Sequence, residues 1–381
     1  MYQALYRKWR PMSFDDVVSQ PHITTTLKNQ IKSGKTAHAY LFTGSRGTGK
    51  TTCARIFAKA INCLDPHDGE PCLECEICKD ADNGTLSDII EIDAASNSKV
   101  DDIRELREGV VYTPERCKYK VYIIDEVHML SAGAFNALLK TMEEPPPHVK
   151  FILATTEIHK VPATIVSRCQ HFDFHRIRNE DIVSRLMYIA SQEGFTLHED
   201  AAGMIARLSD GGMRDALSLL DQCVAYENDI TLDVVSSASG IAGRDYLFDI
   251  LEKIAEKDAA GALRVVDKLY DMSKDLKVLA GELLAQMRNV MIIKTIDNNK
   301  DLITCLPDEY ERLKALAERM KLDEILGDIN TLQECSERFA KSTSKRIELE
   351  MCIIKLCGAA QKAGATAQAV SMLRSQCFLI E

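Results

Sequence analysis

One stretch of the sequence decides the fold, and it reads Gly44-Ser45-Arg46-Gly47-Thr48-Gly49-Lys50-Thr51. This is the pattern G-x-x-x-x-G-K-[ST] of a phosphate-binding loop. Residues 39–43, just before it, are apolar and aromatic and predict a short buried strand, and residues 52–61 carry apolar side chains at helical spacing. A strand, a glycine loop and a helix N-terminus in this order make a chance glycine-rich turn the less favoured interpretation.

The chemistry of phosphate binding explains why these residue types are needed. Three glycines allow the backbone to curl so that its N–H groups point inward at phosphate oxygens, and the helix N-terminus adds unpaired donors and its dipole. The Lys50 ammonium can reach the β- and γ-phosphates, and the Thr51 hydroxyl can bind Mg²⁺. The stretch therefore predicts a nucleotide site.

Length and charge limit the classes of protein to consider. The chain has 381 residues, which suggests two or three domains, and 46% of them are hydrophobic and 27% charged. No apolar run is long enough to span a membrane and the first residues lack a secretory core, so we expect a cytoplasmic protein with no membrane partner. The net charge of −10 argues against a monomer that coats nucleic acid by charge alone, but it leaves room for a local basic surface.

A second strand carries two acids at its end. Residues 120–124 are rich in β-branched side chains and are followed directly by Asp125 and Glu126. In a chain with a phosphate loop this is the Walker B pattern, in which Asp125 holds Mg²⁺ and Glu126 polarises the attacking water. The strand predicted at 149–154 ends at Thr155-Thr156, where a polar side chain can sense the γ-phosphate.

Strands alternate with helices up to about residue 178. We also expect strands at 86–93 and 172–174 and helices at 22–33, 97–109 and 132–144, the last capped by Ser131. The alternation predicts an α/β fold with a doubly wound parallel sheet that binds its ligand at the C-terminal ends of the strands. After residue 178 the strands are expected to stop. Three helices follow at 181–194, 198–210 and 214–226, and then an all-α helical bundle from 245 to 362.

Four of the 13 cysteines cluster with the spacing C-x8-C-x2-C-x2-C. Four thiolates can close a tetrahedron round zinc and leave no open coordination position, so such a site is structural. A redox or disulfide cluster is the alternative, and a reducing compartment disfavours it. The predicted zinc ligands are Cys63, Cys72, Cys75 and Cys78.

Taken together, these residues resemble the AAA+ ATPases and, within them, the γ/τ family of clamp-loader subunits of bacterial DNA polymerase III. The resemblance covers residues 1 to about 220, and the helical remainder matches only by class, as the family's collar. Ser19 is a departure, because glycine is expected before Gln20. The matching stretches are 7–11, 16–20, 44–51, the four-cysteine insert, 124–130, 136–146, 154–156, Ser167-Arg168-Cys169 and 212–217.

The resemblance implies an architecture and an activity. It implies a nucleotide-binding domain over residues 1–178 with a zinc module at 63–78, a helical lid over 179–242, a collar over 243–365 that holds a pentamer together, and a tail over 366–381. The implied cofactors are ATP, Mg²⁺ and Zn²⁺. The implied activity is ATP hydrolysis that loads the sliding clamp onto primed DNA during replication, with other clamp-loader subunits as partners, in the cytoplasm at the nucleoid.

The resemblance also assigns roles to residues. Lys50, Glu126 and Arg168 would be catalytic, Arg168 as an arginine finger on a neighbouring subunit's ATP, although its own chemistry fits a structural ion pair equally well. Thr156 would be the first sensor and Arg214 on the lid the second. The DNA contacts would be Lys99, Arg104 and Lys140, for which a solvated helix face is the alternative. The nucleotide site would comprise Arg10, Val17, Val18, Gly44, Ser45, Arg46, Gly47, Thr48, Gly49, Lys50, Thr51, Thr52, Asp125, Thr156 and Arg214.

Two other functions compete with the clamp loader. One is an AAA+ DNA helicase or branch-migration motor, and the other is a scaffold subunit that does not hydrolyse ATP. Intact Lys50, Asp125 and Glu126 disfavour the scaffold, and the zinc insert with Ser167-Arg168-Cys169 favours the loader over the translocating motor.

Overall fold

The computed structural model describes residues 3–96, 109–240, 245–297, 302–303, 305, 307–339, 342 and 344–358. The chain forms two compact units, Met1–Ser239 and Gly240–Glu381. The helix predicted at 97–109, with Lys99 and Arg104, lies almost wholly outside the described residues. Among the described residues, no helix combines the length and the apolar character needed to cross a membrane.

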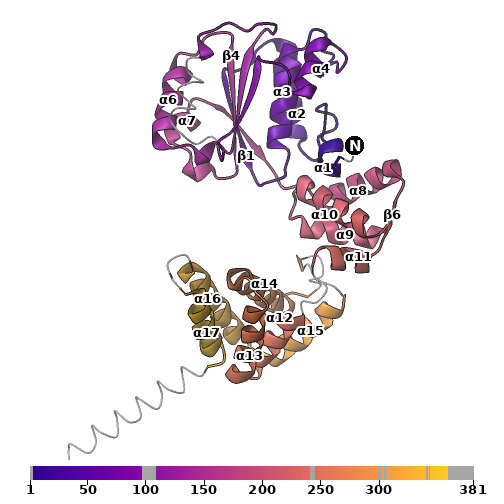
Figure 1. Cartoon of the computed structure of the whole chain (residues 1–381), viewed down its shortest axis with the longest axis vertical. Coiled ribbons are helices and arrows are strands. Elements are labelled where there is room, and N and C mark those ends of the chain that lie inside the picture. The colour runs from indigo at the N-terminus through magenta and orange to yellow at the C-terminus, as the bar shows by residue number, and fades with distance from the viewer. Residues whose placement is uncertain are drawn as a thin grey trace, which may run out of the picture. The chain divides into compact units, whose positions relative to one another are not determined.

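A five-stranded parallel sheet forms the centre of the first unit (Figure 1). Its strand order is β2-β3-β4-β1-β5, which confirms the predicted doubly wound sheet. β2 begins at Ile89 and not at residue 86, because its pairing with β3 starts where Ile89 meets Val121. The strands are β1 (Ala39–Gly44), β2 (Ile89–Asp93), β3 (Lys120–Asp125), β4 (Val149–Thr155) and β5 (Gln170–Phe174).

Helices cover both faces of this sheet because successive side chains of a strand point to opposite sides. From β1, Tyr40 and Phe42 pack with α2 (Pro21–Ser33) and α3 (Lys50–Asn62). Ala39 and Leu41 point the other way and pack with α6 (Ala132–Glu143) and α7 (Ala163–Val166). As predicted, the Ser131 hydroxyl caps α6 by accepting from the Ala134 N–H. Shorter elements are α1 (Leu5–Lys8), α4 (Glu76–Asn83), η1 (Val127–Met129) and η2 (Ile158–Lys160).

A helical subdomain completes the first unit. Its predicted three helices are α8 (Asn179–Glu193), α9 (Glu199–Leu208) and α10 (Met213–Tyr226), and a fourth, α11 (Leu232–Ala238), was not predicted. The expectation that strands stop after residue 178 is wrong, because β6 (Thr196–Leu197) and β7 (Asp229–Ile230) form a parallel pair. Two-residue strands produce no readable alternation in a sequence, and these two depend on a contact between distant connections.

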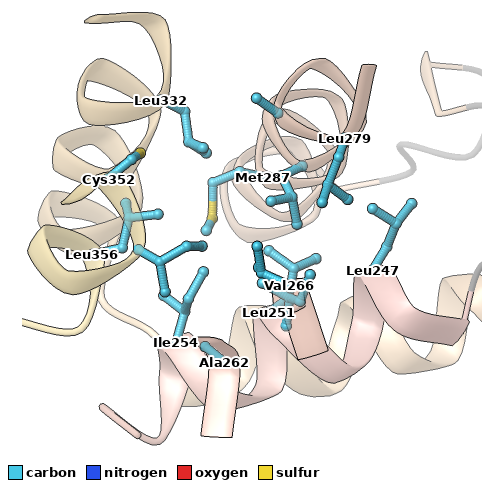
Figure 2. Packing of buried hydrophobic residues seen from close by; sticks show 14 of the residues in the cluster. Leu247, Leu251, Ile254, Ala262, Val266, Leu279, Met287, Leu332, Cys352 and Leu356 are labelled. Carbon is cyan, nitrogen blue, oxygen red and sulfur yellow. The ribbon is translucent and has the colours of Figure 1, made fainter. Parts of the chain in front are cut away.

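Every regular element in the described part of the second unit is a helix. Its core is apolar and is built from all of its long helices, as Figure 2 shows for Leu251, Val266, Met287, Leu332 and Leu356. The predicted bundle is confirmed. Its helices are α12 (Asp245–Ala255), α13 (Ala259–Asp271), α14 (Leu276–Thr295), α15 (Pro307–Arg319), α16 (Leu322–Arg338) and α17 (Lys345–Leu356).

Candidate active site

The phosphate loop joins the end of β1 to the start of α3 and uses its glycines for backbone shape. Gly44, Gly47 and Gly49 have φ angles of 133°, 76° and 104°, in the left-handed region that favours glycine. A Cβ atom at Gly44 would lie 2.3 Å from the carbonyl oxygen of Phe174 on the neighbouring strand. The loop can therefore curl tightly against β5 only with glycine at this position.

The Lys50 ammonium lies inside the loop. Its Nζ donates to the carbonyl oxygens of Gly44 at 2.8 Å and Ser45 at 2.6 Å, and the Thr48 hydroxyl also donates to Ser45 O at 2.8 Å. Burial lowers the pKa of Lys50, and the carboxylates of Glu126 and Asp125 partly oppose this effect. A desolvated ammonium on this scaffold is suited to an incoming polyanion.

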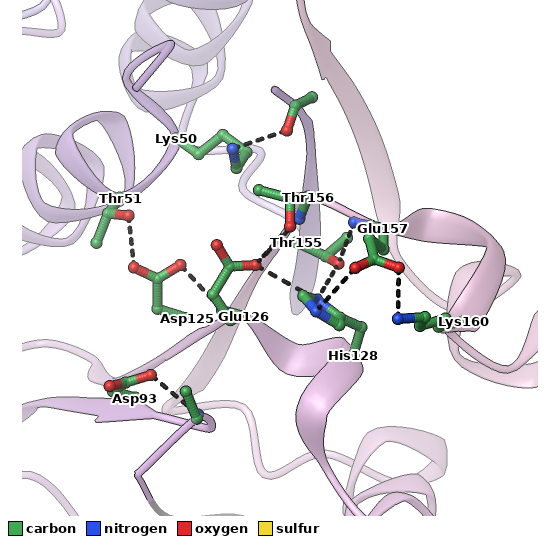
Figure 3. Close-up of polar contacts among 12 residues, drawn as sticks. Lys50, Thr51, Asp93, Asp125, Glu126, His128, Thr155, Thr156, Glu157 and Lys160 are labelled. Carbon is green, nitrogen blue, oxygen red and sulfur yellow. Dashed lines mark hydrogen bonds and ion pairs between the residues drawn. The ribbon is translucent and has the colours of Figure 1, made fainter. Parts of the chain in front are cut away.

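The acids of β3 meet this loop at the C-terminal edge of the sheet (Figure 3). The Thr51 hydroxyl donates to Asp125 Oδ2 at 2.7 Å, so the two predicted Mg²⁺ ligands lie side by side. Glu126 follows, and its Oε2 accepts from the Thr156 hydroxyl at 3.0 Å. The structure thus brings Lys50, Thr51, Asp125, Glu126 and Thr156 together from three elements. Two oxygen ligands beside a phosphate loop fit a Mg²⁺ ion that also binds nucleotide phosphates.

Two polar residues to which sequence reasoning assigned no role, His128 and Glu157, lie with Thr155 of the predicted Thr155-Thr156 pair beside Glu126. His128, Thr155 and Glu157 surround its carboxylate or contact one another, with His128 Nδ1 at 3.3 Å from Glu126 Oε2 (Figure 3). His128 belongs to the family-like stretch 124–130, which could have drawn attention to it. These contacts join residues at the ends of β3 and β4, which lie apart in the sequence, so the spacing of residues within either motif does not reveal them.

The other predicted nucleotide residues lie around the loop. Arg10 Nε donates to the Thr52 hydroxyl at 3.2 Å, and burial is the main cause of its lowered pKa, with the positive charges of Arg55 and Arg214 adding to it. The Arg214 guanidinium lies 5.2 Å from the ring centroid of Tyr6. Val17 and Val18 are half-buried, and Val17 packs against the apolar core. Arg46 is exposed, and its guanidinium lies 3.9 Å from an Asp215 carboxylate oxygen.

Arg168 and Lys140 do not contact the loop in the described part of the chain. Arg168 follows α7, and its guanidinium pairs with Glu143 Oε1 at 2.8 Å and donates to Thr164 O at 2.8 Å. Its side chain is 35% exposed, so part of it faces solvent. Lys140 is exposed on α6.

The four clustered cysteines come together at the end of α3 and the start of α4. A Zn–S distance of about 2.3 Å in a tetrahedron requires sulfurs about 3.8 Å apart. The Sγ pairs Cys63–Cys75, Cys72–Cys78 and Cys63–Cys78 are separated by 4.0, 3.9 and 3.6 Å. Backbone N–H groups of Leu64 and Cys78 and neighbouring thiols outweigh burial and lower the pKa of Cys75 to about 7, whereas burial raises the pKa of Cys63 and Cys78, so the sulfur separations carry the argument. This donor set fits zinc.

Comparisons with known families cover almost the whole chain. Residues 19–178 match the family described as DNA polymerase III, delta subunit. Residues 181–229 match the ATPase lid domain of the DNA polymerase III clamp loader subunit, and residues 230–371 match domain III of DNA polymerase III subunits gamma and tau.

Individual relatives agree with these matches. The tau subunit of Bacillus subtilis is 43% identical over 381 residues, which is 100% of this chain and 68% of the relative. The tau/gamma subunit of Haemophilus influenzae is 39% identical over 93% of this chain, which spans about half (51%) of that relative. Among solved structures, the Holliday junction branch migration motor RuvB of Thermotoga maritima is 19% identical to this chain, with a TM-score of 0.47. The match covers 65% of this chain and 80% of the RuvB chain, and a similarity this low carries no argument about function. The chain therefore belongs to the gamma/tau family of clamp-loader ATPase subunits of DNA polymerase III.

Proposed function

We propose that this chain is the ATP-hydrolysing motor subunit of a sliding-clamp loader. The observation that supports this most is the meeting of Lys50, Thr51, Asp125, Glu126 and Thr156 at one sheet edge, in a chain of the gamma/tau family. A scaffold subunit has no need of this combination, since each group has a separate task in phosphoryl transfer.

The residues divide these tasks by their chemistry. The loop N–H groups and Lys50 bind the phosphates, while Arg10, Val17, Val18 and Arg214 complete the nucleotide pocket. Thr51 and Asp125 hold Mg²⁺, which neutralises charge on the β- and γ-phosphates when bound. Glu126 accepts a proton from, or orients, the attacking water, and the Thr156 hydroxyl senses the γ-phosphate.

Zinc is proposed as a structural cofactor at Cys63, Cys72, Cys75 and Cys78. The sulfur separations of 3.6 to 4.0 Å support a closed tetrathiolate site. Backbone N–H groups add to this support, because those of Cys72, Cys75 and Cys78 donate to the sulfurs of Cys63, Cys72 and Cys75 in turn. With four protein ligands such a site supplies no catalytic water.

The proposed partners are other clamp-loader subunits, the sliding clamp and primed DNA. The helical unit from Gly240 onward would act as the collar of a pentameric ring, and Arg168 would complete the ATP site of a neighbour. Lys140, with Lys99 and Arg104, would contact DNA phosphates only, so that charge removal weakens binding to all sequences alike and flattens its salt dependence. Such an assembly would operate at the replisome in the cytoplasm.

The deciding experiment measures ATP hydrolysis by the chain alone and with partner subunits, primed DNA and clamp. A clamp loader should show a rise in turnover with primed DNA and clamp only after the partner subunits are added. A Glu126→Gln chain in the same assembly is the control for contaminating ATPases. Strong stimulation of the chain alone by DNA, with unwinding or branch migration, would contradict the proposal in favour of a translocating motor.

A further inference from the structure

Residues 10–20 connect α1 to α2 and contain neither helix nor strand. Three of the proposed nucleotide contacts, Arg10, Val17 and Val18, belong to this segment. Arg10, at its start, donates to the Thr52 hydroxyl on α3, the helix that follows the phosphate loop. Because no helix or strand ladder fixes the backbone of segment 10–20, other groups have to hold it in position.

A carboxylate from a distant part of the chain holds the middle of this segment. Glu70 Oε2 accepts from the Phe14 N–H at 2.8 Å, and Oε1 accepts from the Asp15 N–H at 3.1 Å. Lys28 of α2 pairs with the same carboxylate at 2.7 Å, and only 14% of the Glu70 side chain is exposed. Two consecutive backbone donors are thus bound to one charged group, and such hydrogen bonds are stronger than those between neutral groups.

A tight turn brings Glu70 to this place. His67 and Glu70 form an antiparallel bridge, with N···O distances of 3.1 and 2.8 Å. Between them, Asp68 and Gly69 have φ angles of 54° and 83°, and a type I′ turn requires positive φ at both of these positions. The turn lies within the insert between Cys63 and Cys72, and its shape is set by its own residues.

The turn also packs directly against α2. A Cβ atom at Gly69 would lie 2.6 Å from the carbonyl oxygen of Lys28, so glycine is needed for this approach. Asp68 pairs with Lys32, one helical turn further along α2. The turn is therefore attached to α2 on one side and, through Glu70, to segment 10–20 on the other.

The position of Phe14 is passed on to the proposed pocket residues. The Phe14 ring is buried in the core on the α2 and α3 side of the sheet, and its carbonyl oxygen accepts from the Val17 N–H at 3.1 Å. Val17 packs against the same core. A displacement of the Phe14 backbone therefore also displaces Val17.

We propose that Glu70 is a positioning residue that fixes segment 10–20 for nucleotide binding. This rests on the proposed function, in which Arg10, Val17 and Val18 complete the nucleotide pocket. Glu70 acts through the backbone of Phe14 and its neighbour and is not itself a nucleotide ligand. The insert between α3 and α4 thus contributes to nucleotide affinity without contacting the nucleotide.

The test measures equilibrium binding of labelled ATP by the isolated chain and three variants. Glu70→Ala removes both acceptors and should weaken binding about 10-fold, the order of change expected when charge-assisted hydrogen bonds that hold a binding-competent state are lost. Asp68→Asn is the matched control, because it breaks the ion pair of the same turn with Lys32 while asparagine tolerates the positive φ. It should bind within about twofold of the parent. Lys50→Ala should abolish binding.

Kinetics of the assembled complex distinguish positioning from general damage. Glu70→Ala should raise KM for ATP about 10-fold and leave kcat at saturating ATP within about twofold, because Lys50, Asp125 and Glu126 keep their places. A fall in kcat with unchanged KM would contradict the proposal. The zinc content of Glu70→Ala should equal that of the parent, and its loss would make the cysteine site, rather than segment 10–20, the cause.

The binding results separate the possible failures. If Lys50→Ala abolishes binding and Glu70→Ala does not weaken it, the positioning role fails. An equal loss in Asp68→Asn and Glu70→Ala would assign the effect to the contact of the turn with α2, which also contradicts the role of Glu70. If Lys50→Ala binds ATP normally, the proposed nucleotide site fails instead.

One measurement on the parent chain decides the case in which Glu70→Ala does not fold. Saturating ATP should slow hydrogen exchange of the Phe14 and Asp15 amides, because the held segment and the bound nucleotide stabilise each other by linkage. Exchange of these two amides at the same rate with and without ATP would overturn the proposal.

Discussion

The guanidinium of Arg168 pairs with the carboxylate of Glu143, with 2.8 Å between Nη2 and Oε1. The two residues belong to α6 and the turn after α7, and both are partly exposed, at 52% for Glu143 and 35% for Arg168. An exposed ion pair of this type is worth little to stability, about 1 kcal/mol or less. Arg168 can therefore exchange Glu143 for another anion with little loss of stability. An arginine finger that binds the ATP of a neighbouring subunit has to make such an exchange.

Arg168→Ala should leave the ATP affinity of the isolated chain nearly unchanged and reduce hydrolysis in the assembled complex by a factor on the order of 10³, since fingers supplied in trans contribute about that much or more. Glu143→Gln is the matched control, because it breaks the same ion pair but keeps the guanidinium, and it should retain hydrolysis. In complexes that mix Arg168→Ala with Lys50→Ala chains, hydrolysis should return only at subunit interfaces where an intact Arg168 of one chain faces an intact phosphate loop of the next. Equal loss of monomer ATP binding in Arg168→Ala and Lys50→Ala would contradict the role in trans.

Lys50→Ala and Glu126→Gln should separate binding from turnover. Removing the ammonium that lies on Gly44 O and Ser45 O should abolish nucleotide binding, since it takes the mobile cation from the phosphates. Glu126→Gln should keep binding but block hydrolysis, because an amide cannot accept the proton of water. Equilibrium binding of labelled ATP and phosphate release measure the two effects, and normal phosphate release by Glu126→Gln would refute its role as base.

Metal analysis of the purified chain should find one zinc ion per chain. Cys75→Ser should lose the ion, because three thiolates remain of the four that close the tetrahedron. Cys117→Ser is the control, since Cys117 lies outside the cluster of four sulfurs, and it should keep the ion. ATP hydrolysis should survive in Cys75→Ser chains that remain folded. Four titratable thiols in a metal-free, fully folded chain would exclude the zinc site.

Ser19 occupies the position where the family resemblance predicts glycine, and its φ of 59° explains that expectation. Its hydroxyl donates to Asp181 at the start of α8. Ser19→Ala and Ser19→Gly both lose this bond, but alanine also keeps the backbone strain. The free energy of unfolding of the alanine variant should therefore be about 1 kcal/mol lower than that of the glycine variant. Fluorescence of Trp9, the one tryptophan of the chain, reports unfolding of this unit in denaturant; equal stability of the two variants would contradict the strain.

Asp328 on α16 should make the second unit less stable as pH rises. The residue is 8% exposed and its Oδ2 has no hydrogen-bond partner among the described residues. Burial raises its pKa to about 6. Because the folded value lies above the unfolded one, the protonated form favours folding, and this advantage is complete below about pH 4 and lost as pH rises through 6.

Asp328→Asn should remove this dependence. At pH 8 it should stabilise the unit by on the order of 2 kcal/mol, allowing for partial solvent screening, and at pH 4 it should make no difference. Hydrogen exchange of the α16 amides at both pH values measures the effect. Glu337→Gln, an exposed site on the same helix, is the control and should show no such pH-dependent gain. A difference that is the same at pH 4 and pH 8 would contradict the prediction.

Much of the fold and part of the site could be predicted because they depend on local patterns. The stretch from Gly44 to Thr51 needs glycines and a lysine at set positions in order to wrap a phosphate, so its spacing, with the strand and helix predicted on either side, identified the loop. The two acids at the end of β3 are adjacent in the sequence, and the four cysteines all lie within residues 63–78, so both sets are local as well. The alternation of strands and helices then predicted a parallel sheet with the loop and the two acids at one edge.

Tertiary structure alone decided which side chains meet at that edge. β3 and β4 are joined through α6, and their parallel pairing brings Thr156 and Glu157 to Glu126 and His128. The bond of Ser19 to Asp181, the pairing of Arg168 with Glu143 and the short β6–β7 pair likewise join segments distant in sequence. The physical reason is that a contact across strands depends on strand order and register, which arise from packing of the whole core, whereas a loop or a metal cluster is specified by the spacing of its own residues.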